Sequence, residues 1–104
     1  MFDLKGKTAL VTGGSRGLGA GICECLGKAG ANVAVNYFNN ADAADEVVSK
    51  IISQNGSAEK FKADITSEDE VKYLVRCVRE RFGSVDIVVV NATCLQVTKP
   101  LEMQ

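Results

Sequence analysis

The sequence contains no histidine, and its four cysteines form no recognisable metal-binding motif. There is no C-x-x-C pair, and Cys23 and Cys25 would lie about 200° apart around one helix, so they could not both face one metal ion. We therefore expect no metal site. The cysteines are instead interpreted as small packing residues in a reducing compartment: Cys23, Cys25, Cys77 and Cys94.

The sequence also lacks long apolar runs and a surplus of charge of one sign. Residues 1–7 offer no apolar stretch for a signal peptide, and no window approaches the roughly eighteen apolar residues of a membrane span. The 12 Lys and Arg residues nearly balance the 13 Asp and Glu residues, and a net charge of -1 gives no means of holding a polyanion through counterion release. We predict a cytoplasmic protein with neither a membrane nor a nucleic acid as partner.

The remaining composition is that of an ordinary globular protein. Hydrophobic residues make up 46% of the sequence and charged residues 24%, and there is a single proline. A chain of 104 residues is long enough for one compact unit, and no linker, low-complexity tract or block of charge divides it. We expect one unit over residues 1–104.

Short apolar runs alternate with segments of helical periodicity along the whole chain. The runs predict strands at residues 8–12, 32–37, 58–63 and 85–90. The periodic segments predict helices at residues 17–29, from Asn39 or Asn40 to Gln54, and from Ser67 to Phe82. Strands and helices in strict alternation specify a parallel sheet with right-handed crossovers, so the predicted fold class is α/β.

Three local features of these elements can be predicted from their residues. The first helix should bury one apolar stripe, namely Leu18, Ile22, Cys25, Leu26 and Ala29, and end at a left-handed Gly30. The second should bury Ala44, Val47, Val48, Ile51 and Ile52. In the third, Ser67 and Glu70 should form a capping box in which each satisfies the other's exposed amide.

The segment Val11–Gly21 carries five glycines directly behind the first strand. The first amides of a helix have no internal partners, and the helix dipole adds positive charge there, so a strand-to-helix turn is an anion site. A diphosphate needs a sharp turn, a backbone it can touch and close packing of helix on strand, and Gly13, Gly17 and Gly19 fill these roles. The alternative is a flexible surface turn. A P-loop is excluded because no Gly-Lys-Ser/Thr ending follows.

The segment Thr12–Gly19, TGGSRGLG, resembles the T-G-x-x-x-G-x-G signature of the short-chain dehydrogenase/reductase family. The resemblance covers the whole chain, because an acidic residue, Asp64, follows the third strand, and Asn91-Ala92 is similar to the second half of the family's N-N-A-G element. Residues 31–37 look most like the 3-oxoacyl-(acyl-carrier-protein) reductase branch. The resemblance implies a Rossmann-like, doubly wound sheet with strand order 3-2-1-4 and three helices.

The resemblance also implies which residues bind a dinucleotide. The turn would contribute Gly13, Ser15, Arg16, Gly17, Leu18 and Gly19. Asp64 and Ile65 would border the adenine, with Asp64 accepting a hydrogen bond from its amino group, and Asn91 and Ala92 would line the route to the nicotinamide ribose. The alternative for Asp64 is a simple strand-to-helix turn of the Asp-Ile-Thr-Ser type.

Charge at the end of the second strand favours NADP(H) over NAD(H). A free 2′-hydroxyl is commonly held by a carboxylate at this position, and a carboxylate would repel a 2′-phosphate. Here Asn36 and Tyr37 stand at the strand end, no acid precedes Asp42, and Arg16 offers a guanidinium suited to phosphate. The alternative is that Arg16 is a solvated loop residue and Asn36 merely ends a strand.

The sequence departs from the family in two places. Val90 and Thr93 replace the first Asn and the Gly of N-N-A-G. The family's catalytic Ser and Y-x-x-x-K pair are also missing, since Ala41 and Cys77 stand four residues after the two tyrosines. We therefore identify no catalytic residue and interpret residues 1–104 as the truncated cofactor-binding part of a reductase for a carbonyl substrate, such as a 3-oxoacyl thioester. The alternative is a stand-alone nucleotide-binding or regulatory module.

The implied strand order predicts an exposed apolar surface. Two helices would cover one face of the sheet and one helix the other, while the fourth strand, Val85–Val90, is of the apolar kind usually covered on both faces but would form an edge. We expect this surface to promote association into a homo-oligomer or pairing with a missing segment.

Overall fold

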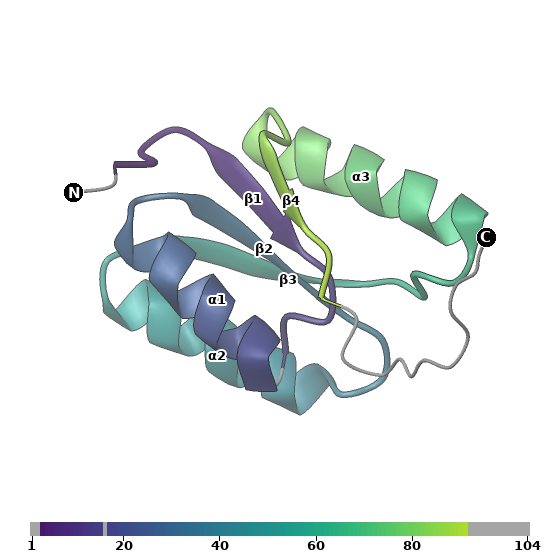
Figure 1. Cartoon of the computed structure of the whole chain (residues 1–104), viewed down its shortest axis with the longest axis horizontal. Helices are drawn as coiled ribbons and strands as arrows, with labels where there is room; N and C mark the ends of the chain where they lie inside the picture. The colour runs from purple at the N-terminus through teal and green to yellow at the C-terminus, as the bar shows by residue number, and fades with distance from the viewer. Residues whose placement is uncertain (1–2, 16, 92–104) are drawn as a thin grey trace.

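The chain folds into one parallel sheet with helices on both faces (Figure 1). The computed structural model describes residues 3–15 and 17–91, and in them the strand order is β3-β2-β1-β4. The elements are β1 (Thr8–Val11), α1 (Gly17–Lys28), β2 (Asn32–Tyr37), α2 (Ala41–Ser53), β3 (Ser57–Lys62), α3 (Glu68–Phe82) and β4 (Ile87–Val89). The predicted α/β class and strand order 3-2-1-4 are confirmed.

The strands of the sheet send alternate side chains into two separate cores. On one face, α1 and α2 cover residues of β1, β2 and β3, and the buried set is Ala9, Val11, Cys23, Ala31, Val33, Val35, Ala44, Val47, Ile51 and Ala58. On the other face, α3 alone packs against the sheet through Leu74 and Val78, which meet Leu10, Ala34 and Ala63. The period of two along each strand therefore divides the apolar residues between two helical layers.

The face that α1 buries differs from the predicted stripe. Leu18 is 69% exposed and Cys25 is also exposed, whereas Gly19, Cys23 and Gly27 are buried. The physical reason is close packing: a Cβ at Gly27 would lie 2.9 Å from Cγ2 of Ile51 in α2. Small residues let the helices approach, while Ile22 and Leu26 of the predicted stripe pack against the same core, partly buried.

Cys23 is the one cysteine of the described residues that is fully buried, and its thiol donates to the carbonyl oxygen of Gly14 at 3.7 Å. Burial, reinforced by the nearby Glu24 carboxylate, raises the pKa of the Cys23 thiol to about 12. The predicted packing role thus holds for Cys23 and is wrong for the exposed Cys25, while Cys94 lies outside the described residues.

Helix ends follow the sequence signals in part. Asn40 caps α2 by accepting from the N–H of Ala43, and Gly30 has the predicted positive φ of 102°.

The prediction for Ile52 was wrong, because it is 53% exposed and Ile51 alone of this pair points inward. None of the helices in the described residues combines the length and apolar character of a membrane span.

The capping box at the start of α3 forms only in one direction. Ser67 Oγ accepts from the N–H of Glu70 at 3.3 Å, as predicted. The Glu70 carboxylate does not accept from the N–H of Ser67, which donates instead to the carbonyl oxygen of Asp64. The Glu70 carboxylate accepts from the N–H of Asp64 at 2.7 Å, so Glu70 fixes the loop between β3 and α3.

The sheet leaves apolar side chains of β4 in solvent. Ile87 and Val89 pack against the core under α1 and α2, whereas Val88 is 56% exposed and Val90 is 71% exposed. Beside them, between β4 and α3, lies an apolar hollow of about 240 Å³, lined by Leu10, Thr12, Ile65, Val71, Leu74, Val75, Val88 and Val90. β4 is therefore an edge strand with apolar side chains exposed on the α3 side, as the predicted strand order implied.

We expect Gly27→Val to lower the free energy of unfolding by about 1–3 kcal/mol, because its side chain would be forced between α1 and Ile51. Gly21 lies in the same helix, and no atom lies within 4 Å of a Cβ placed there. Gly21→Val is thus the matched control and should change stability by no more than about 0.5 kcal/mol. Urea unfolding followed by circular dichroism measures both, and equal effects would contradict the close helix packing.

Candidate functional site

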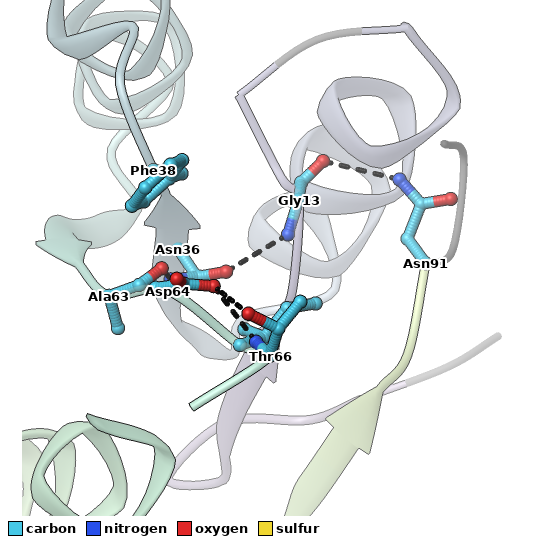
Figure 2. Close-up of a pocket in the computed structure, with 8 residues that line it drawn as sticks. Gly13, Asn36, Phe38, Ala63, Asp64, Thr66 and Asn91 are labelled. Carbon is cyan, nitrogen blue, oxygen red and sulfur yellow. Dashed lines mark hydrogen bonds between the residues drawn. The ribbon is translucent and has the colours of Figure 1, made fainter. Parts of the chain in front are cut away.

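A hollow of about 210 Å³ lies at the edge of the sheet where β1, β2 and β3 end (Figure 2). Its lining comes from the end of β2 and from the segments that follow the four strands: Gly13, Asn36, Phe38, Ala63, Asp64, Ile65, Thr66 and Asn91. The carboxyl edge of a parallel sheet is the usual place for ligands in such folds. The sheet therefore brings five of the predicted site residues together, namely Gly13, Asn36, Asp64, Ile65 and Asn91.

The turn between β1 and α1 has a backbone that suits glycine. Gly13 and Gly17 have φ angles of +62° and +56°, which strain any residue with a side chain. Gly17 faces open space, so a ligand can reach the backbone there. A Cβ at Gly19 would overlap the carbonyl oxygen of Gly13 and lie 2.6 Å from Nδ2 of Asn91. The missing side chain at Gly19 thus allows α1 to begin directly against the end of β1.

The start of α1 offers a site for an anion. The helix begins at Gly17, so its first amides have no carbonyl oxygen one turn earlier to bind. No acidic residue lies in this first turn, and the helix dipole adds partial positive charge. Phosphate groups are bound at helix N-termini for these two reasons. The exposed Leu18 and the half-buried Ser15 stand beside these amides.

Asn91 ties the end of β4 to the glycine turn. Its N–H donates to Oγ1 of Thr12 at 3.0 Å, and its Nδ2 donates to the carbonyl oxygen of Gly13 at 3.2 Å. The N–H of Thr12 in turn donates to the carbonyl oxygen of Val89 at 3.0 Å. Sequence reasoning selected Asn91 and missed Thr12, although a hydroxyl directly before a glycine turn is a signal of such bonding.

Asn36 is the most buried polar residue of the hollow, with 2% of its surface exposed. Its Oδ1 accepts from the N–H of Gly13 at 3.1 Å. Its Nδ2 lies 3.3–3.4 Å from three carbonyl oxygens, those of Tyr37, Phe61 and Ala63. The next residue, Tyr37, packs on the opposite face of the sheet, against the core under α1 and α2.

Asp64 is held at the rim of the hollow by Thr66. One carboxylate oxygen, Oδ1, accepts from both the N–H and the hydroxyl of Thr66, at 2.9 and 2.6 Å (Figure 2). The Thr66 hydroxyl and amide lower the pKa of the Asp64 carboxyl below its ordinary value. The strand-to-helix turn considered as the alternative role is thus present. It leaves the second carboxylate oxygen of Asp64 without a hydrogen bond from the described residues.

Three lining residues were not predicted: Phe38, Ala63 and Thr66. Phe38 is 54% exposed directly after β2, and the Asp-x-Thr spacing would have indicated Thr66 as the partner of Asp64. Two predicted residues, Arg16 and Ala92, lie outside the described residues, as does Thr93. Residues 3–15 and 17–91 contain no cluster of three potential metal ligands from Cys, Asp and Glu.

Comparison with known proteins identifies relatives along nearly the whole chain. A family model described as short chain dehydrogenase matches residues 7–104. The chain is 46% identical over 101 residues to hydroxynaphthalene reductase arp2 of Aspergillus fumigatus, covering 97% of this chain and 37% of that protein. It is 41% identical over 90 residues to glucose 1-dehydrogenase 2 of Bacillus subtilis, covering 86% of this chain and 35% of the relative.

The structure is also similar to solved structures. A short chain dehydrogenase from Burkholderia cenocepacia J2315, determined in complex with NADP, superposes with a TM-score of 0.78 at 44% sequence identity, covering 82% of this chain and 35% of that one. The chain thus spans little more than a third of the length of these relatives.

We expect Thr66→Val to raise the pKa of Asp64, because the hydroxyl donor is lost while the backbone donor stays. A lowered pKa stabilises the fold above the unfolded-state pKa, and this contribution is lost as the pH falls through the folded-state pKa. The variant should therefore show a weaker loss of stability in the acidic range. Carboxyl NMR titration of Asp64 measures the shift, with Asp86, held by Ser84 and Thr8, as an unaffected reference. An unchanged Asp64 pKa would contradict the assigned contact.

Proposed function

The chain belongs to the short-chain dehydrogenase family, and from this premise we propose that residues 1–104 form the NADP(H)-binding portion of an oxidoreductase acting on a carbonyl or alcohol. The observation that carries the proposal is the glycine turn. Gly17 exposes the backbone at the start of α1, and the missing side chain of Gly19 brings that start against the sheet. This arrangement suits the diphosphate of a dinucleotide.

The hollow beside the turn suits the adenine end of the cofactor. Phe38 and Ile65, which are 54% and 39% exposed, supply apolar surface for a flat ring. Asp64, at the rim, supplies a carboxylate oxygen that can accept from an exocyclic amino group. Asn91 lines the side toward β4 and would lie along the route to the nicotinamide ribose.

The proposed preference for NADP(H) over NAD(H) rests on charge. No carboxylate stands at positions 37–39, so nothing that follows Asn36 at the end of β2 would repel a 2′-phosphate. Arg16 stays the sequence-based candidate for the positive partner. A similar solved protein, the dehydrogenase from Burkholderia cenocepacia, was determined with NADP, which supports the same choice.

When bound, the nicotinamide would supply or accept the hydride. This chain's own residues would bind and orient the cofactor: the amides from Gly17 onward at the diphosphate, and Asp64 at the adenine. The sequence contains no Tyr followed four residues later by Lys, so we propose cofactor binding without turnover for residues 1–104 alone. The same absence favours a stand-alone binding module as second candidate.

The substrate proposed within the carbonyl class is a 3-oxoacyl thioester, which rests on the resemblance of residues 31–37 alone. Relatives are named for a hydroxynaphthalene and for glucose, so the family match supports the reaction class rather than one substrate. The cytoplasmic location and the lack of a nucleic acid partner stay predictions from composition.

We expect wild-type protein titrated with NADPH and NADH to bind NADPH more tightly, with NMR shift changes at Gly17, Leu18 and Asp64. Phe38→Asp should weaken NADPH binding about tenfold or more relative to Phe38→Asn, because the introduced charge would lie near the 2′-phosphate. The two variants lose the same aromatic ring, so the Asn variant is the matched control for charge. NADH binding should be similar in both.

Absence of binding by folded wild-type protein would refute the proposed function. Equal losses of NADPH and NADH affinity in Phe38→Asp relative to Phe38→Asn would refute the placement of the 2′-phosphate.

We also propose that the protein associates with a second copy of itself through the apolar surface around Val88 and Val90. These side chains are 56% and 71% exposed, and they adjoin the apolar hollow between β4 and α3. Since contiguous apolar surface of this kind usually marks a contact site, the edge strand β4 is the centre of the proposed interface.

We expect wild-type protein to show concentration-dependent association in analytical ultracentrifugation. The double substitution Val88→Thr and Val90→Thr should weaken it about tenfold or more, because two apolar groups become polar without a change in shape. Ile52→Thr, at a 53% exposed position on α2, is the control and should leave association unchanged. A monomeric wild type that binds no hydrophobic dye would contradict the proposal.

A further inference from the structure

We propose that Asn36 is a positioning residue, which holds the glycine turn in the shape that binds the diphosphate and acts on NADPH and NADH alike. The inference rests on the proposed function. Its basis is the set of hydrogen bonds that the Asn36 side chain makes within the protein, of which Figure 2 shows the one to the Gly13 N–H.

Asn36 holds two consecutive residues of the turn. Its side-chain Oδ1 accepts from the N–H of Gly13 at 3.1 Å, and its backbone oxygen accepts from the N–H of Gly14 at 2.9 Å. On the other side of the turn, Nδ2 of Asn91 donates to the carbonyl oxygen of Gly13. The N–H and the carbonyl oxygen of Gly13, a residue with positive φ, are therefore both held by asparagine side chains.

These bonds assign different tasks to the amides of the turn. The N–H groups of Gly13 and Gly14 are engaged inside the protein, so they set the path of the backbone and do not face a phosphate. The amides that face a ligand begin at the start of α1, at Gly17. The position of the α1 amides depends on the path of the backbone at Gly13 and Gly14, which Asn36 fixes.

The donor side of Asn36 couples the turn to β3. Nδ2 lies 3.3 Å from the carbonyl oxygens of both Phe61 and Ala63, and Ala63 directly precedes Asp64. One side chain thus connects the diphosphate end of the proposed site to its adenine end. A carboxylate at position 36 would face these carbonyl oxygens without a donor, at a position that is 2% exposed.

The same burial keeps the Asn36 side chain from contacting the groups that distinguish NADPH from NADH. A residue that contacts the 2′-phosphate must reach the ligand with a free polar atom, whereas both polar atoms of the Asn36 side chain are engaged within the protein. The neutral residue at this position is therefore required by the β3 carbonyls and by Gly13. It carries no information on the choice between NADP(H) and NAD(H).

The experiment titrates NADPH and NADH into wild type, Asn36→Leu and Asn36→Thr, each first shown to be folded by circular dichroism. We expect Asn36→Leu to weaken binding of both nucleotides by the same factor, about tenfold or more, since one held hydrogen bond corresponds to about that change. Asn36→Thr keeps a hydroxyl and should lose less. If the Leu variant does not fold, the Thr variant carries the test.

Asn32→Leu is the matched control. Asn32 is at the other end of the same strand, and its Nδ2 donates to Oγ1 of Thr8 at 3.4 Å, away from the hollow. It should leave both affinities unchanged. A second readout, independent of any variant, is hydrogen exchange of the Gly13 amide in wild type. We expect this amide to be protected although it lies outside helices and strands.

Three results would overturn the inference: a loss confined to NADPH, which marks a direct 2′-phosphate contact; unchanged affinities in a folded Asn36→Leu variant; and free exchange of the Gly13 amide. If wild type binds neither nucleotide, the proposed function itself fails and the positioning role fails with it. That result differs from the other three, in which wild type still binds.

Discussion

The geometry of the candidate site depends on how closely α1 approaches the end of β1. At this crossing Gly19 lies against Gly13, and a single methyl group on Gly19 would overlap the Gly13 carbonyl oxygen. The approach brings the unpaired amides of α1 to the carboxyl edge of the sheet, next to the ends of β2 and β3 (Figure 1). A helix starting one side-chain layer further out would leave those amides in solvent, away from Asp64 and the hollow.

The sequence predicts the fold well because both faces of the sheet are covered. Apolar runs and helical periodicity locate every element, with ends that differ from the structure by at most two residues, as helix and strand ends usually do. The buried face of α1 was beyond such reasoning. Gly19, Cys23 and Gly27 carry little hydrophobic signal, and their burial follows from the distance between packed elements, which is a property of the tertiary structure.

For the site, the sequence identifies the residues more readily than it identifies their hydrogen-bond partners and roles. Asn36, Asp64 and Asn91 were selected. The partners of the two asparagines in the glycine turn lie 23 to 79 residues away, where no local pattern indicates them, whereas the Thr66 partner of Asp64 follows from the Asp-x-Thr spacing. Glu70 shows the same limit. Its spacing from Ser67 predicts a reciprocal cap, yet the Ser67 amide is already bound to the Asp64 carbonyl oxygen, and the Glu70 carboxylate binds the amide of Asp64 instead.

Charge is distributed unevenly around the hollow, so its two sides suit different groups of a ligand. Its lining contains one acid, Asp64, which Thr66 holds at the β3 side, while the side toward α1 is built from glycine and from the neutral amides of Asn36 and Asn91. An amide side chain donates and accepts at once, so it can tie backbone groups together without adding negative charge beside the helix N-terminus. Carboxylates at positions 36 and 91 could accept from the turn but could not donate, and their charge would oppose an anion at α1. A ligand with an anionic group at one end and a hydrogen-bond donor at the other would be oriented by these residues, and the proposed dinucleotide has both groups.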